Sequence, residues 1–295
     1  MRPPRRPSSL CLSSAPLCRY HRAYLMNLNE LPRRVRTSIG YRTIRQRDAA
    51  FRRLLPLTFP AARGRRFRAS SEGAHSEWTI IHSGATDAQT ASPELVGLCL
   101  EAASLARKVD VGFVARRATG EERDTASRWP GEHYRLLPAL VEVWKARRVT
   151  EIGTSTGLSA LTFQRAVPVE HVITFDIHPW TYYRGTALRE DDFDGSLEQR
   201  LADLSEPTAF AANLDAIADA DLLFIDGPKD GAFEPKFFDL LWRHPPTRRQ
   251  LLVIDDVRVI TMTELWRKFP IAKFDATSFG HWSGTGLAIR EPGLQ

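Results

Sequence analysis

The sequence is poor in cysteine and has no long apolar run. Its three cysteines, Cys11, Cys18 and Cys99, are odd in number and form no C-x-x-C pair, which argues against a disulfide framework and against a structural zinc site. Sparse, unpaired cysteines are typical of a reducing compartment, so the sequence predicts a cytoplasmic protein. No apolar stretch approaches the roughly 20 residues that cross a bilayer as a helix. We therefore expect a soluble chain without a transmembrane segment.

Acidic residues and lysine are scarce at the amino end. Residues 1–70 hold 17 arginines, no lysine and only Glu30 and Asp48 as acids, a formal charge of +15. Because the whole chain carries +6, the remaining residues carry 6 minus 15, or −9. This acidic body argues against a nucleic-acid-binding groove in the folded part. Only the basic extension is suited to such contacts.

The Arg-rich residues 1–70 are expected to form an extension that is poorly ordered or partly helical. Residues 1–25 combine Arg, Ser and Pro with a complete lack of acids, as transit peptides do. A start of the protein at Met26 explains the same composition. Residues 27–70 fit either a solvated arm or a basic amphipathic helix that binds an acidic surface or a membrane.

The rest of the chain divides into a helical lead-in, expected over 71–128, and a main domain over 129–295. In the lead-in, Ser92 is expected to cap a helix whose first turn contains Pro93 and Glu94. A second helix is expected over about 131–147. Beyond it, short apolar runs alternate with helical patterns, which predicts a parallel sheet covered by helices on both faces. Residues 273–290 contain two short strands around a Gly-rich turn and predict a terminal hairpin.

Acidic residues stand at the ends of four apolar runs: Glu151, Asp176, Asp226 and the pair Asp255-Asp256. The carboxyl ends of parallel strands meet at one edge of a sheet, and ligands bind in the crevice beyond that edge. Aspartate also favours turns and helix caps, which explains one or two of these positions. Four acidic strand ends together predict a binding site.

The turn after the first strand lacks the second glycine of a dinucleotide-binding loop. It reads G-T-S-T-G from Gly153 to Gly157, so Ser155 stands where G-x-G-x-x-G requires glycine, which argues against NAD. Asp176 follows Gly157 by 19 residues, close to the roughly 20 expected of an acid that accepts both ribose hydroxyls. Both observations fit an adenosyl ligand without a pyrophosphate.

This loop, followed in order by Asp176, Asp226 and Asp255, resembles class I S-adenosylmethionine-dependent methyltransferases over about residues 129–290. The resemblance implies an α/β fold with a doubly wound, mostly parallel seven-stranded sheet, helices on both faces and a C-terminal antiparallel hairpin whose seventh strand lies beside the sixth. It also implies S-adenosylmethionine as the cofactor. The residues expected to bind the cofactor are Glu151, Gly153, Thr154, Ser155, Gly157, Asp176, Asp203 and Asp226.

Within this set, two acids have specific expected partners. The resemblance implies that Asp176 binds the ribose hydroxyls and that Asp203 binds the amino group of adenine. A place on the surface of a helix explains Asp203 equally well.

The segments F-I-D-G-P-K-D-G and V-I-D-D-V resemble the metal-dependent catechol and caffeoyl-CoA O-methyltransferases. That resemblance implies Asp226, Asp255 and Asp256 as ligands of Mg²⁺ or another divalent cation, with Asp226 and Lys229 as catalytic residues. Lys229 would act as a base if its surroundings lower its pKa. A hard cation relieves the repulsion among three converging carboxylates. The alternative is a metal-free enzyme in which the aspartate pair caps a helix, and the Gly-Pro dipeptide before the lysine departs from the family's pattern.

Other residues near this edge are also candidates. His281, in the terminal hairpin, is a second candidate base, although a turn histidine bound by backbone groups is the commoner case. His133 fits either the cofactor site or a buried structural position. The aromatic side chains after the second strand fit a wall or lid of the substrate site, or packing on a helix below: Trp180, Tyr182 and Tyr183.

Three functions compete on this evidence. The first is O-methylation of a small hydroxylated molecule, such as a sugar or a phenolic. The second is methylation of RNA or another nucleic acid with help from the basic extension, which the lack of an N-P-P-Y motif after the fourth strand disfavours. The third is a binding protein without chemistry, which would not need an intact glycine loop. The methyl acceptor stays open, as does the choice between a monomer and a homo-oligomer.

Overall fold

The computed structural model describes residues 91–119, 133–280 and 283–293. The Arg-rich extension over 1–70 and His281 lie outside the described residues. None of the helices in the described ranges combines the length and the apolar character that crossing a bilayer requires.

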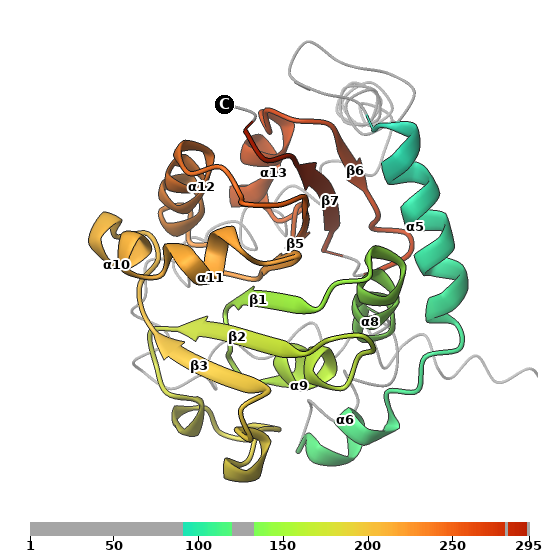
Figure 1. Ribbon diagram of the computed structural model, residues 1–295, viewed down its shortest axis with the longest axis vertical. Coiled ribbons are helices and arrows are strands. Elements are labelled where there is room, and N and C mark those ends of the chain that lie inside the picture. The colour runs from blue at the N-terminus through green and yellow to red at the C-terminus, as the bar shows by residue number, and fades with distance from the viewer. Residues whose placement is uncertain (1–90, 120–132, 281–282, 294–295) are drawn as a thin grey trace, which may run out of the picture. The chain divides into compact units, whose positions relative to one another are not determined.

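Seven strands of the described residues form one sheet in the order β3-β2-β1-β4-β5-β7-β6 (Figure 1). The strands are β1 (Arg148–Ile152), β2 (His171–Asp176), β3 (Leu197–Leu201), β4 (Leu222–Ile225), β5 (Gln250–Asp255), β6 (Lys273–Asp275) and β7 (Thr285–Arg290). Strands β1 to β5 run parallel, while β7 is antiparallel to both β5 and β6. The predicted parallel sheet and terminal hairpin are confirmed, with β7 between β5 and β6.

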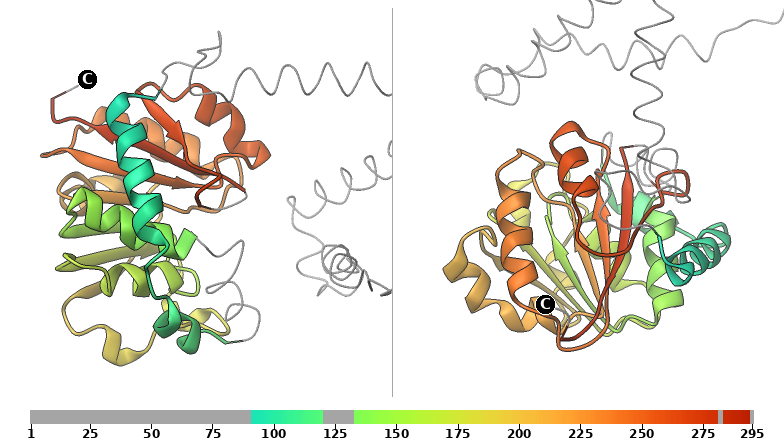
Figure 2. Two further views of the ribbon diagram at one scale, coloured as in Figure 1. Left: turned by 90° about the vertical axis from the view of Figure 1, so that its right-hand side faces the viewer. Right: turned by 90° about the horizontal axis from the view of Figure 1, so that it is seen from above.

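Helices cover the sheet on both faces (Figure 2). One layer contains α5 (Pro93–Ala106), α6 (Gly112–Arg117), α8 (His133–Trp144) and α9 (Leu158–Gln164). The other contains α10 (Pro207–Ala212), α11 (Leu214–Ala218), α12 (Phe233–Arg243) and α13 (Ile260–Arg267). Two 3-10 turns, η1 (Trp180–Tyr182) and η2 (Glu190–Asp192), lie between β2 and β3.

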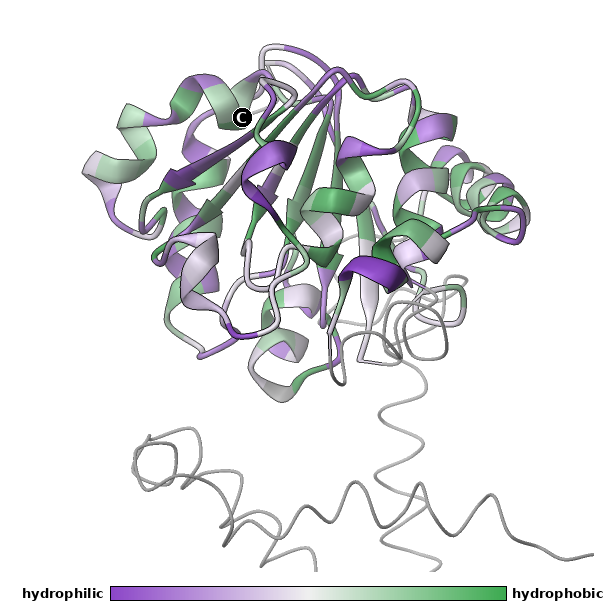
Figure 3. Ribbon diagram, turned by 90° about the horizontal axis from the view of Figure 1, so that it is seen from below, coloured by the Kyte–Doolittle hydropathy of each residue, from purple (hydrophilic) through white to green (hydrophobic). Residues whose placement is uncertain are grey.

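Alternation along each central strand divides the core between the two faces. On β4, Leu222 and Phe224 pack in the cluster with α5, α8 and α9, whereas Leu223 and Ile225 pack in the cluster with α10 to α13. Successive side chains of a strand point to opposite faces, so a continuous apolar run serves both clusters. Figure 3 shows these hydrophobic strands between helices that carry hydrophilic residues.

The helix start expected at Ser92 is confirmed, because its side chain accepts the N–H of Leu95 at 3.2 Å. The second helix is also present, as α8. Over 207–218 the sequence pattern predicts one helix, and this is wrong. Asn213 interrupts it with φ −120° and ψ 18°, so α10 and α11 are separate. Its side-chain amide donates to the Ala209 carbonyl at 2.9 Å, a local bond that competes with continuation of the helix.

Candidate functional site

The loop between β1 and α9 has a backbone that only glycine accommodates at its first position. Gly153 has φ +104°, and a Cβ placed there would lie 2.1 Å from the carbonyl oxygen of Asp226. The N–H groups of Gly153 and Thr154 both donate to the Phe175 carbonyl, at 2.8 and 3.1 Å. The loop therefore lies against the ends of β2 and β4, which brings three strand ends together.

Asp176 is a hydrogen-bonding centre at the end of β2. Its Oδ2 accepts the N–H of Ser155 at 2.9 Å, and its Oδ1 accepts the N–H of His178 at 3.0 Å. The hydroxyl of Tyr183 donates across both oxygens, at 2.9 Å from Oδ1 and 3.1 Å from Oδ2. The predicted ribose-binding carboxylate is therefore fixed in orientation by the glycine loop.

A cavity of about 600 Å³ opens at the carboxyl ends of β1 to β4. Five of the eight residues expected to bind the cofactor line it: Gly153, Ser155, Asp176, Asp203 and Asp226. Asp203 follows β3 and accepts the N–H of Ser205 at 2.9 Å, so it belongs to the loop after a strand and not to the surface of a helix. Phe233 and Lys236 of α12 also line the cavity, and no sequence motif indicates either of them.

The other three expected residues, Glu151, Thr154 and Gly157, are buried and do not line this cavity. Glu151 has no exposed surface. Its Oε2 accepts the Thr174 hydroxyl at 2.6 Å, and that hydroxyl lies 2.7 Å from the hydroxyl of Thr154. In the structure the side chain of Glu151 lies in a buried polar network under the loop, and its contact with the cofactor stays a prediction.

Burial raises the pKa of Glu151 to about 8, because the charged form loses its hydration. Hydrogen bonds from Ser159 and Thr174 oppose this shift, and the nearby charges of Asp226 and Asp176 add to it. Glu151 therefore keeps its proton at pH values at which an ordinary carboxyl group has lost it.

Three aspartates converge at the ends of β4 and β5. Asp226, Asp255 and Asp256 each offer a carboxylate oxygen, and these oxygens lie within 4.8 Å of one another. Lys229 pairs with Asp226, and its Nζ lies 3.6 Å from Oδ2 of Asp256. The sequence-based prediction that these four residues lie together agrees with this geometry. Carboxylate oxygens at this separation match the donor set of a hard divalent cation.

The charges of this cluster act on each other. Burial raises the pKa of Asp226 to about 6, Lys229 opposes the shift, and the charges of Asp255 and Asp256 add to it. Burial lowers the pKa of Lys229, but the three aspartates outweigh that effect and raise it above the ordinary value of lysine. The condition for Lys229 as a base, a lowered pKa, is therefore not met here, and its Nζ is an ammonium group.

Two turns position the cluster. Lys229 has φ +49° and Asp256 has φ +60°, conformations that non-glycine residues adopt at a cost. The buried carboxylate of Glu234 stabilises the first turn by accepting the N–H of Lys229 at 2.7 Å.

His133, the first residue of α8, places its Nδ1 3.9 Å from Oδ1 of Asp255. His133 is buried, and sequence spacing offers no signal for this proximity.

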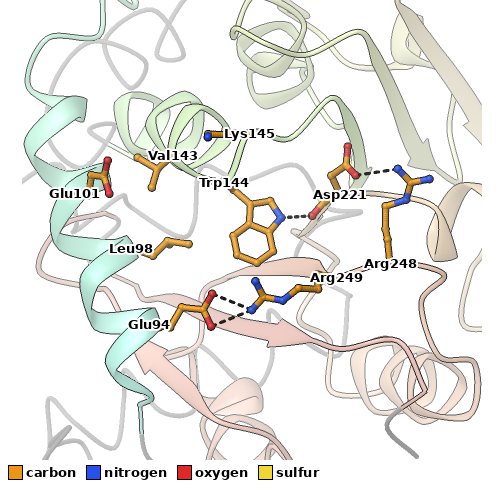
Figure 4. A pocket seen from close by; sticks show the side chains of 9 residues that line it. All are labelled: Glu94, Leu98, Glu101, Val143, Trp144, Lys145, Asp221, Arg248 and Arg249. Carbon is orange, nitrogen blue, oxygen red and sulfur yellow. Dashed lines mark hydrogen bonds and ion pairs between the residues drawn. The ribbon is translucent and has the colours of Figure 1, made fainter.

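A second cavity, of about 540 Å³, lies at the opposite edge of the sheet, where β1, β4 and β5 begin (Figure 4). Most of its charged groups are engaged with each other. Arg249 binds both oxygens of Glu94 at 2.9 Å and lies over the Trp144 ring, 5.2 Å from its centroid. The Trp144 indole donates to the Asp221 carbonyl at 2.7 Å. These contacts join α5 and α8 to the sheet and account for the cavity's polar lining.

No protein-family model matches the chain, and neither does any curated protein. Solved structures align with it at low identity. The O-methyltransferase TomG from Streptomyces achromogenes, solved with SAM, is 19% identical over 63% of this chain and 92% of TomG, with a TM-score of 0.44. SAH-bound PaMTH1 from Podospora anserina is 13% identical over 79% and 97%, with a TM-score of 0.43.

A methyltransferase from Geobacter sulfurreducens is 18% identical over 68% of this chain and 98% of its own, with a TM-score of 0.43. Each of these three solved proteins is described as a methyltransferase.

Proposed function

We propose that the chain is an S-adenosylmethionine-dependent O-methyltransferase that acts on a small hydroxylated molecule. The observation that carries this is the shared cavity of Gly153, Asp176, Asp203 and Asp226 at the carboxyl edge of the sheet. In a doubly wound sheet, ligands bind where the strand order reverses, and here the order reverses between β1 and β4. The acidic cluster lies at the same edge, where a methyl acceptor would meet the cofactor.

Each cavity residue has a role in this proposal. The close backbone of Gly153 and Ser155 would receive the central part of the cofactor. Asp176 would accept the ribose hydroxyls, and Asp203 would accept the amino group of adenine. Methyl transfer is a displacement at the sulfonium carbon and depends mainly on the alignment of cofactor and acceptor.

Asp176→Asn tests the cofactor assignment. Two hydrogen bonds to a charged acceptor weaken, so we expect the Kd for S-adenosylhomocysteine to rise about 100-fold. Calorimetric titration measures this. Asp239→Asn is the matched control, because Asp239 is an exposed residue of α12 that pairs with Arg243. Equal affinity of the wild type and Asp176→Asn would contradict the assignment.

We also propose that a divalent cation assists the reaction. The residues that would hold it are Asp226, Asp255 and Asp256, whose oxygens fit a hard cation. When bound, such an ion would orient the acceptor oxygen and lower the pKa of its hydroxyl. Lys229 holds a proton at Nζ in the present cluster. It would act as a base only if a bound cation offset the negative charge around it and so lowered its pKa. A catalytic role for His281 stays a prediction.

Asp256→Asn tests the cation site without an assay of activity. Loss of one of three carboxylate charges is expected to weaken Mg²⁺ binding at least about tenfold. Calorimetry of the full chain with Mg²⁺ measures the change, with Asp239→Asn again as control. Should wild type and Asp256→Asn take up Mg²⁺ equally or not at all, the metal-assisted form of the proposal is wrong.

Methylation of a nucleic acid is the less supported alternative. The +15 charge of residues 1–70 favours it, but several acids line the cavity, among them Asp203, Glu206 and Asp230. An acidic rim repels phosphates. A cytoplasmic location, a homo-oligomeric state and the domain boundaries near residues 70 and 128 likewise stay predictions.

A further inference from the structure

The hydroxyl of Tyr183 is hydrogen-bonded to Asp176, the carboxylate that the proposed cofactor would use. Its hydroxyl is shared between the two oxygens of Asp176, at 2.9 and 3.1 Å. The N–H groups of Ser155 and His178 take one further position each, one on each oxygen. A carboxylate offers about four acceptor positions, so Asp176 has none left for the two hydroxyls of a ribose.

Tyr183 belongs to the cavity itself. It lines the cavity together with Gly153 and Asp203 and is half-buried. Burial and the hydrogen bond to Asp176 raise the pKa of Tyr183 to about 12, so the hydroxyl keeps its proton at neutral pH and acts as a donor. In this position it satisfies the same acceptor atoms that a ribose diol would satisfy.

The segment before Tyr183 is anchored independently of this contact. The side chain of Gln199 on β3 accepts the N–H of Trp180 at 2.9 Å and donates to the carbonyl of His178 at 3.2 Å. The Trp180 ring stacks on Phe193, with the ring centroids 5.6 Å apart. Rotation of the Tyr183 side chain therefore breaks the contact with Asp176 while these anchors stay in place.

We propose that Tyr183 holds the place of the ribose hydroxyls and competes with the cofactor for Asp176, which limits the affinity for the cofactor. This inference rests on the proposed function. When the cofactor binds, two ribose hydroxyls replace one phenol hydroxyl, and each oxygen of Asp176 receives a donor of its own. The phenol hydroxyl returns to water. Part of the binding free energy is therefore lost in displacing Tyr183.

Tyr183→Phe tests the inference, because it removes the competing hydroxyl and keeps the ring. We expect the Kd of the full chain for S-adenosylhomocysteine to fall about three- to tenfold in calorimetry, the range for one net hydrogen bond. Tyr182→Phe is the matched control. Tyr182 is exposed and stacks on His178 at a centroid distance of 4.2 Å. The substitution removes the same hydroxyl group, but the Kd of this variant for S-adenosylhomocysteine should equal that of the wild type.

The double variant Asp176→Asn with Tyr183→Phe completes a thermodynamic cycle. The gain from Tyr183→Phe should largely disappear there, because the charged acceptor is gone. If the wild type binds S-adenosylhomocysteine and Tyr183→Phe binds it no more tightly, the inference on Tyr183 is overturned and the proposed function stands. An equal gain in Tyr182→Phe also overturns the inference. If neither the wild type nor Tyr183→Phe binds it, the proposed function fails, and this inference with it.

Discussion

Gly153→Ala is expected to abolish cofactor binding and to lower the free energy of unfolding by about 3–5 kcal/mol. The added methyl carbon would lie 2.1 Å from the Asp226 carbonyl oxygen, a backbone atom that cannot rotate away. The ends of β1 and β4 would have to separate, and the cavity between them would change shape. Urea unfolding and calorimetry with S-adenosylhomocysteine measure the two effects.

Gly195→Ala separates the steric effect from the backbone effect. Gly195 has φ +98°, close to the +104° of Gly153, but a Cβ there would meet nothing within 4 Å. This control substitution should lower the free energy of unfolding by only about 1 kcal/mol, because alanine is less stable than glycine at a positive φ. If both variants lose the same stability, the close approach of the loop to β4 is not what requires glycine at 153.

Glu151→Gln is expected to remove a large part of the pH dependence of stability. The pKa of Glu151 is about 8 in the folded chain and 4.5 in its ordinary state. Between these values the folded state keeps a proton that the unfolded state has released, so the wild type loses stability as the pH rises from 4.5 to 8. Between pH 5 and pH 7.5 the loss is on the order of 3 kcal/mol.

Urea unfolding at pH 5 and at pH 7.5 measures this for the wild type and for Glu151→Gln. The amide resembles the neutral acid in shape and has no proton to lose, so the variant should gain stability relative to the wild type at the higher pH. Glu142→Gln is the control, because Glu142 is exposed on α8. Parallel pH profiles of the wild type and Glu151→Gln would mean that Glu151 is not protonated in the folded chain.

Several features of the fold were predictable because they depend on local pattern. Apolar runs of the right length predict β1, β2, β4 and β5, and the Ser-Pro-Glu sequence predicts the start of α5. The break between α10 and α11 within 207–218 was not predictable in the same way. The apolar residues of 207–218 keep a helical period across Asn213, whereas the backbone of Asn213 leaves the helical conformation and its side chain binds the Ala209 carbonyl.

The candidate site likewise contains residues whose positions the sequence predicts and residues whose positions it does not. Asp176, Asp226 and Asp255 follow apolar runs, so parallel topology alone brings them to one edge. Glu151 differs from these three aspartates in its position. It lies within β1, one residue before Ile152 at the end of the strand, and the side chains of a strand alternate between faces. Its carboxyl group therefore enters the buried network with Thr174 and does not enter the cavity.

The amino-acid sequence by itself determined the α/β class, the glycine loop and the acidic edge of the sheet, because periodicity, turn chemistry and strand ends are local properties. Only the tertiary structure decided which side chains meet. It placed Tyr183 on Asp176, His133 beside Asp255, and Lys229 among three carboxylates that raise its pKa. These contacts join residues from different strands, helices and loops, and their burial and charge depend on how the whole chain packs.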